Sequence, residues 1–215
     1  MQHGTLHTGE VTRTVPWETC RNTVCRGTVT EMEEIVIRAV TQEDMEQVRT
    51  LYRSHIAYNE KTYMSAGEGP ALQAECLARA LGGDLVDAQS IAATYGNDGC
   101  FLVATLSGAP ETVVGIAGLQ DLGLVGGEKA AELRRMTVHE AHRKLKIGTK
   151  IVAALERHAR SHGFARIDLE TMSGFITAVG FYLSSACGFV QASQPGPESE
   201  GRPWGGLVTF SKRLV

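Results

Sequence analysis

The spacing of hydrophobic and polar positions changes several times along this chain, and each change marks a predicted element. Apolar residues alternate or run together over residues 35–40, 101–106, 112–119, 133–138, 166–171 and 207–214, which predicts six strands. Apolar residues recur every three or four positions over residues 42–59, 71–81, 147–162 and 176–187, which predicts four helices, with a further short helical piece over 84–93. The predicted order is strand, two helices, three strands, helix, strand, helix and strand.

The connections between these elements predict how the strands pair. The turn at Ser107–Pro110 joins two strands into an antiparallel hairpin, and a glycine-rich connection at 123–127 leads to the strand at 133–138. The strand at 166–171 follows a strand–helix unit, so we expect it to run parallel to the strand at 133–138. The predicted fold class is therefore α/β (α+β), with a mixed, mostly antiparallel sheet.

Residues 1–33 show no periodicity, and we predict a disordered N-terminal tail followed by one domain over residues 34–215. Arg13, Arg21 and Arg26 leave an organelle-targeting peptide open as an alternative, but no amphipathic arginine face supports it.

Composition excludes several classes of protein. The net charge of -3 and charged content of 21% show no global bias toward nucleic acid. Five cysteines without a C-x-x-C pair argue against a disulfide framework and favour a reducing, cytoplasmic location. The histidines and carboxylates form no metal-binding motif, so no metal is expected, and no apolar run is long enough to predict a membrane span.

The candidate chemistry lies in a basic turn before the helix at 147–162. Arg143, Lys144, Lys146 and Lys150 surround the start of that helix, where unpaired backbone amides already attract anions. Gly148 would let a ligand approach the backbone closely. This pattern is typical of a diphosphate site, and a solvated connecting loop is the alternative.

The stretch from Arg143 through Lys146 to Gly148, with a strand before it and a helix after it, resembles motif A of the GNAT superfamily of acyl-CoA-dependent N-acetyltransferases. The order of elements is similar to the GNAT fold over about 180 residues. The resemblance implies a sheet splayed between its fourth and fifth strands, with helices on both faces. Lys146 departs from the family's pattern, which has glycine there. If the family's backbone needs an unusual dihedral at this position, lysine would carry strain of about 1 kcal/mol or more.

The resemblance also implies the cofactor site. The pantetheine arm of acetyl-CoA would pair like an added strand with backbone groups of Met136, Thr137 and Val138. The pyrophosphate would lie on the turn and helix start, which comprise Arg143, Lys144, Leu145, Lys146, Ile147, Gly148 and Thr149.

Two residues are candidates for proton transfer. Glu132 stands where several family members carry a catalytic or substrate-orienting glutamate, and pairing with Arg134 is the alternative role. Tyr182 resembles the tyrosine that protonates the departing thiolate in this family. The family has Gly-Phe four residues after that tyrosine, whereas Gly188 begins six after Tyr182. The extension is either absorbed at the helix end or turns Tyr182 elsewhere, into the core.

These features predict an enzyme that transfers an acetyl group from acetyl-CoA to a primary amine. A non-catalytic acyl-CoA-binding sensor is the alternative, and a protein-interaction domain without cofactor leaves the basic helix start unexplained. The acceptor would be chosen by the first two helices and the loop at 191–205, which carry no readable motif. Glu68, Glu75, Asp84 and Asp87 could attract a cationic amine, but they are interpreted as solvated surface, and a homodimer is left open.

Overall fold

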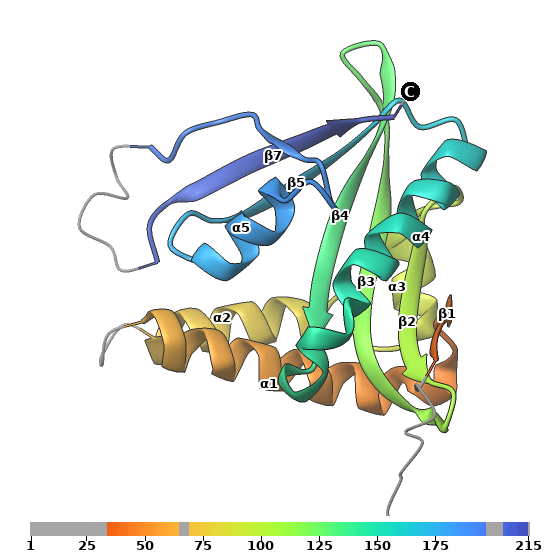
Figure 1. Cartoon of the computed structure of the whole chain (residues 1–215), viewed down its shortest axis with the longest axis vertical. Helices are drawn as coiled ribbons and strands as arrows, with labels where there is room; N and C mark the ends of the chain where they lie inside the picture. The colour runs from red at the N-terminus through yellow and green to blue at the C-terminus, as the bar shows by residue number, and fades with distance from the viewer. Residues whose placement is uncertain (1–33, 65–68, 197–203, 215) are drawn as a thin grey trace, which may run out of the picture. The chain divides into compact units, whose positions relative to one another are not determined.

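The computed structural model describes residues 34–64, 69–196 and 204–214, with side chains from residue 73 onward in the second range. The predicted tail at 1–33 lies outside the described residues. Seven strands form one sheet in the order β1-β2-β3-β4-β5-β7-β6 (Figure 1). All neighbouring strands are antiparallel except β4 and β5, which are parallel as predicted.

The strand bounds extend the predictions at several ends. The strands are β1 (Ile35–Ala39), β2 (Cys100–Leu106), β3 (Ala109–Val125), β4 (Glu128–Val138), β5 (Arg166–Met172), β6 (Val190–Gln191) and β7 (Leu207–Arg213). The hairpin of β3 and β4 continues past the predicted ends because Leu124 pairs with Lys129 and Val125 with Glu128. The two-residue strand β6 was not predicted, since so short a segment carries no period of its own.

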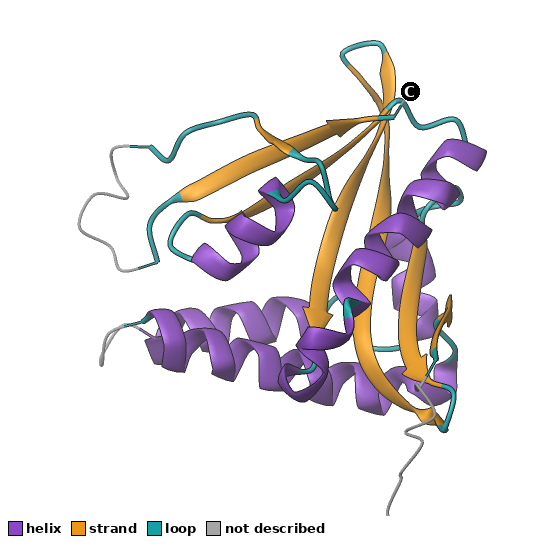
Figure 2. Cartoon of the chain, in the orientation of Figure 1, coloured by secondary structure: helices purple, strands orange, loops and turns teal. Residues whose placement is uncertain are grey.

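The α-helices are α1 (Met45–Tyr63), α2 (Gly69–Leu81), α3 (Ala88–Tyr95), α4 (Ile147–Ser161) and α5 (Ile176–Leu183), and two 3-10 turns, η2 (Gln42–Asp44) and η3 (Glu140–Leu145), precede α1 and α4. Figure 2 shows the strands fanning apart from one end of the sheet, with α4 and α5 on the side toward the viewer. The prediction for the last helix was too long, because α5 ends at Leu183 and the chain turns at Ser184.

Two hydrophobic cores cover the two faces of the sheet. Under α4, the side chains of Ile147, Ile151 and Leu155 are completely buried against the strands. Burial of each such side chain contributes roughly 1.5–3 kcal/mol to folding. On the other face α1 and α3 pack through Val48, Leu51 and other apolar residues. The predicted placement of helices on both faces is therefore confirmed.

Candidate active site

The site is organised around an opening between β4 and β5. Their pairing comprises Ala130 with Arg166, Ala131 with Ile167, and Glu132 with Asp168, and within the described residues it stops there. Beyond this point β4 stays paired with β3 while β5 stays paired with β7, so the two strands separate toward α1 and α2 (Figure 1). The β4 edge that follows Glu132 therefore turns backbone groups toward the opening without a strand partner.

A β-bulge interrupts β4 along this edge. Gly118 of β3 pairs with Arg134 and Ile116 pairs with Thr137, so Arg135 and Met136 both lie opposite a single β3 residue. Arg135 has φ 57°, a left-handed conformation that costs roughly 1–2 kcal/mol in a residue other than glycine. The bulge sets how Met136 and the residues after it present their amides to the opening.

Side chains after the bulge divide between the two faces of the sheet. Met136 and Val138 pack against the core under α4. Thr137 points to the opposite face, where its side chain is 2% exposed and its Oγ1 has no hydrogen-bond partner. An unpaired buried hydroxyl costs free energy, and Thr137 is one of the described residues that carries this cost.

The predicted anion site lies where β4 leads through η3 into α4. Lys146 precedes the helix with φ 57° and ψ 26°, so the strain anticipated for a lysine at this position is present. The amide of Lys150 donates to the Lys146 carbonyl at 3.1 Å, which leaves the amides of the first turn of α4 without intrahelical acceptors. Such a helix end attracts phosphate oxygens.

Gly148 has a packing role that the sequence did not reveal. A Cβ at this position would lie 3.0 Å from Cζ of Phe181 on α5. The absence of a side chain at Gly148 therefore lets α5 approach the first turn of α4, in addition to any access it gives a ligand.

Arg143 connects the turn to α1. Its guanidinium carbon lies 3.9 Å from the centre of the Tyr58 ring, and its Nε donates to the Val138 carbonyl at 3.5 Å. Both contacts hold the cation beside the end of β4.

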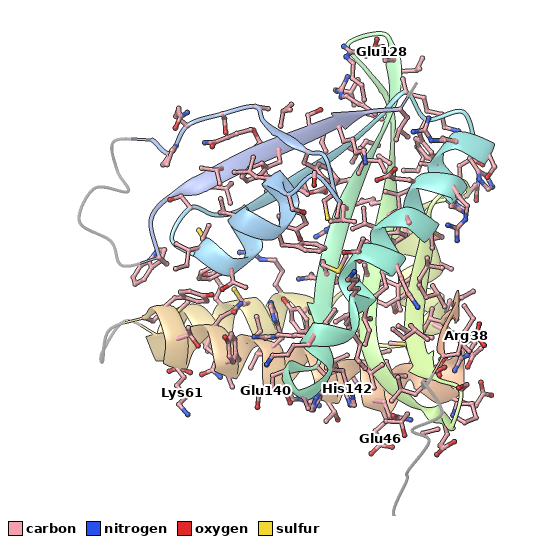
Figure 3. All side chains as sticks on the ribbon, in the orientation of Figure 1. Arg38, Glu46, Lys61, Glu128, Glu140 and His142 are labelled. Carbon is pink, nitrogen blue, oxygen red and sulfur yellow. The ribbon has the colours of Figure 1, made fainter. Side chains whose placement is uncertain are left out.

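A pocket of about 380 Å³ lies between α1 and the end of β4. Its lining comprises Leu51, Ser54, His55, Ala57, Tyr58, Lys61, Thr62, Thr137, Val138, His139, Glu140 and Arg143; Figure 3 labels Lys61 and Glu140. Burial, followed by the charge of Arg143, lowers the pKa of His55 to about 4. His55 is therefore neutral at pH 7, and its Nε2 lies 3.1 Å from the side-chain nitrogen of Asn59.

Glu132 lies beside a second pocket, of about 550 Å³, whose lining comprises Leu122, Glu132, Arg166, Asp168, Leu169, Glu170, Ala192, Thr209, Phe210 and Ser211. Burial raises the pKa of Glu132; the nearby Arg134 opposes this change, and the charges of Glu170 and Asp168 add to it. The ion pair with Arg134 that was the alternative role is loose, with 3.8 Å between Arg134 Nε and Glu132 Oε2. A carboxylate with a raised pKa is better suited to accept a proton near neutral pH.

Tyr182 is 7% exposed and packs among Phe181, Phe189 and Phe210, with ring centres 5.3–6.2 Å away. Burial raises its pKa, so its hydroxyl stays protonated at neutral pH. The two-residue extension is absorbed after the helix, where the Gly188 amide donates to the Ser184 carbonyl at 2.7 Å. Tyr182 thus remains in the last turn of α5 and belongs to the buried core under α4, which is the location that the alternative interpretation expected. Its role as an acid stays a prediction.

The sequence did not reveal a buried polar network at the bulge. Arg135 forms two hydrogen bonds to Asp84, of 2.9 and 2.7 Å, and one of 2.9 Å to the hydroxyl of Tyr52. The interpretation of Asp84 as solvated surface was wrong, because this residue is 5% exposed and also accepts a bond from Tyr95. No local pattern could show this, since the partners come from distant parts of the chain.

Two further expectations were that the chain has no metal site and no membrane span. The structure bears on them only for the residues that it describes. Among those residues, no three His, Cys, Asp or Glu side chains are grouped so that they could hold a metal ion. Nor does any described helix combine the length and apolar character needed to cross a membrane.

Comparison with known proteins adds to this geometry. Residues 72–189, more than half of the chain, match the model of the acetyltransferase (GNAT) family. A comparison with curated proteins finds no significant match.

Solved structures with this arrangement include three bacterial and archaeal proteins. An acetyltransferase of the GNAT family from Staphylococcus aureus Mu50 is 22% identical, with a TM-score of 0.60 over 85% of this chain and 100% of the other. The PaiA N-acetyltransferase of Thermoplasma acidophilum, solved with coenzyme A, is 20% identical, with a TM-score of 0.62 over 84% and 99%. YncA of Salmonella typhimurium, a putative acetyltransferase solved with its cofactor acetyl-CoA, is 19% identical, with a TM-score of 0.55 over 85% and 95%. At these identities, the structural similarity shows a shared fold and nothing more.

Proposed function

Since the chain belongs to the GNAT family of acetyltransferases, we propose that it transfers an acetyl group from acetyl-CoA to a primary amine by direct attack while both are bound. One observation carries this proposal: the β4 edge that β5 leaves unpaired after Glu132 leads through η3 to the N-terminus of α4. A ligand with an extended amide-bearing arm and a diphosphate matches these two features in that order.

The residues present fit acetyl-CoA. Backbone groups of Met136, Thr137 and Val138 lie on the edge where the pantetheine arm would add as a strand. The first amides of α4 and the nearby side chains of Lys144 and Lys146 would hold the pyrophosphate. Bound there, acetyl-CoA supplies the activated acyl group as a thioester.

The bulge gives the chain a donor for the reacting carbonyl. A backbone amide at Met136 would donate a hydrogen bond to the oxygen that gains negative charge when the amine attacks. Loss of one such donor costs about 3 kcal/mol of transition-state stabilisation in enzymes where it has been removed.

Two side chains would move the protons. Glu132, with its raised pKa, would accept a proton from the ammonium form of the acceptor, directly or through water, because only the neutral amine has a free lone pair. Tyr182 would donate its proton to the departing thiolate. Burial raises the pKa of this hydroxyl, which makes it a weaker acid than an exposed tyrosine.

The acceptor would approach from the face of β4 opposite α4. Thr137 and Glu132 both line pockets, and Thr137 points away from the core under α4, against which its neighbours Met136 and Val138 pack. This direction leaves the α4 face to the cofactor and lets the amine reach the thioester beside the bulge.

Release of free thiol from acetyl-CoA in the presence of a panel of primary amines tests the proposal. We expect amine-dependent release, and we expect coenzyme A at one hundred times its Kd to raise the free energy of unfolding by about 2.7 kcal/mol. Tight binding of acetyl-CoA without amine-dependent release would instead identify a non-catalytic binding module. No binding at all would overturn both interpretations.

A further inference from the structure

The β4 bulge is held by a side chain that belongs to its own strained residue. Arg135 has its backbone in the left-handed region, and its guanidinium is clamped between Asp84 and Tyr52. The side chain of Arg135 is 12% exposed and that of Asp84 is 4% exposed. A strained conformation persists only where its surroundings fix it, and here the fixing contacts are identifiable.

Three hydrogen bonds fix the position and orientation of the Arg135 guanidinium. Nε and Nη2 of Arg135 donate to the two oxygens of Asp84 at 2.9 and 2.7 Å, a bidentate arrangement that fixes both the position and the plane of the guanidinium. Nη1 donates to the Tyr52 hydroxyl at 2.9 Å, and the guanidinium carbon lies 5.2 Å from the centre of the Tyr52 ring. The hydroxyl of Tyr95 donates to Asp84 at 3.1 Å, so the carboxylate is itself held in place.

The partners come from separate elements behind the sheet. Tyr52 belongs to α1, Asp84 to the turn between α2 and α3, and Tyr95 to the end of α3. The network therefore connects three parts of the helical layer to the point on β4 where Arg135 and Met136 lie opposite a single residue of β3. A buried ion pair that served only stability would have no need to lie at this point.

We propose that Arg135 is a positioning residue for acetyl transfer, which acts by holding the bulge so that the neighbouring Met136 amide faces the thioester carbonyl. This inference rests on the proposed function. The guanidinium does not touch the cofactor: it sets the direction of the next peptide unit, and the amide of that unit stabilises the developing oxyanion.

The variants Arg135→Lys and Tyr52→Phe test this role. Lysine keeps the charge but cannot form the bidentate pair, and phenylalanine keeps the ring but removes one acceptor of the clamp. We expect kcat to fall about tenfold or more in Arg135→Lys and less in Tyr52→Phe, while the affinity for coenzyme A measured by calorimetry changes less than about twofold.

A spectroscopic measurement separates positioning from general stability. Acetyl-CoA carrying ¹³C at the acetyl carbonyl gives an isotope-shifted infrared band, and a hydrogen bond from Met136 lowers its frequency relative to free acetyl-CoA. We expect this lowering in the wild-type protein and its partial loss in both variants. If Arg135→Lys does not fold, Tyr52→Phe decides alone.

Arg38→Lys is the matched control. Arg38 also makes a bidentate pair with a buried carboxylate, to Asp44 at 2.6 and 2.7 Å, but it lies on β1 at the far edge of the sheet (Figure 3). The Arg38→Lys variant should therefore be less stable than the wild type, with an unchanged carbonyl band and an unchanged kcat.

Variants of Arg135 and Tyr52 that fold, bind acetyl-CoA and keep both the wild-type band and the wild-type kcat overturn the positioning role but leave acetyl transfer intact. A wild-type protein that binds acetyl-CoA without lowering the band overturns the role of Met136. A wild-type protein that does not bind acetyl-CoA removes the proposed function and this inference together.

Discussion

Glu132 of β4 and Asp168 of β5 form the last pair of residues before the two strands separate. The carboxylate of Glu132 is therefore located at the apex of the opening, partly withdrawn from water, with its side chain 26% exposed. Its charge is close enough to those of Asp168 and Glu170 for both to raise its pKa. Its place at the apex leads to the first prediction.

Replacement of Glu132 by glutamine should lower kcat by about a hundredfold or more, because the amide keeps the shape but cannot accept a proton. The affinity for acetyl-CoA should hardly change. Steady-state kinetics and calorimetry measure the two effects. Wild-type kcat in this variant at saturating substrate would mean that solvent deprotonates the amine.

The pH dependence of kcat/KM should reflect the environment of Glu132. Because its pKa is raised, Glu132 takes up a proton at a higher pH than an ordinary glutamate, whose pKa is about 4.3. Activity should fall as pH decreases through that raised value. The variant Glu170→Gln removes one of the charges that raise it, so the acidic limb should move to lower pH. If the acidic limb of the kcat/KM profile does not move in this variant, a group other than Glu132 causes it.

The same shift predicts a small gain in stability for Glu132→Gln. A carboxyl whose pKa is raised on folding stabilises the folded state only at low pH, and this contribution is lost as pH rises from about 4.3 through the folded-state value. At pH 7 the variant should therefore unfold at an equal or higher temperature than the wild type, as measured by circular dichroism.

Replacement of Gly148 by glutamate should abolish acetyl-CoA binding, because a negative charge would occupy the pyrophosphate site and a side chain would press on Phe181. Gly148→Ala separates the two effects, since it adds the close contact with Phe181 without a charge, and it should weaken binding slightly. Gly180→Ala, where a Cβ meets nothing within 4 Å, is the control and should bind normally. Normal coenzyme A binding by Gly148→Glu in calorimetry would remove the helix start from the cofactor site.

Lys146→Gly should relieve the strain of the left-handed residue and stabilise the protein by about 1 kcal/mol. Coenzyme A affinity should stay equal or increase. A tenfold loss of affinity, about 1.4 kcal/mol, would show that the Lys146 ammonium binds phosphate directly.

Tyr182→Phe should lower kcat with little change in melting temperature, since the aromatic packing around the ring is preserved. If kcat is unchanged, the thiolate leaves without protonation by this residue, which a thiol pKa near 8.5 permits.

The sequence predicted the elements with long periodic patterns and the parallel pair at the centre of the sheet. It also pointed to Lys146 as a position of possible backbone strain, because the family's glycine pattern is broken there, and the structure shows a left-handed conformation at this residue. It missed the bulge at Arg135, although the three-residue step from Leu133 to Met136 on the core face interrupts the two-residue alternation there. The contact of Gly148 with Phe181 and the burial of Asp84 depend on helices that are distant in the chain, so no local pattern contains them.

Among the described residues, the two parts of the sheet are joined only by the short pairing of β4 with β5 that ends at Glu132 and Asp168. The two parts can therefore unfold separately. β1 to β4 and β5 to β7 are two hydrogen-bonded blocks, which a pantetheine arm lying between them would connect. In the ligand-free protein, amide protons of β5 and β7 should exchange with deuterium through a local opening that leaves the first block protected. Coenzyme A should slow this exchange and make the two blocks open as a single cooperative unit.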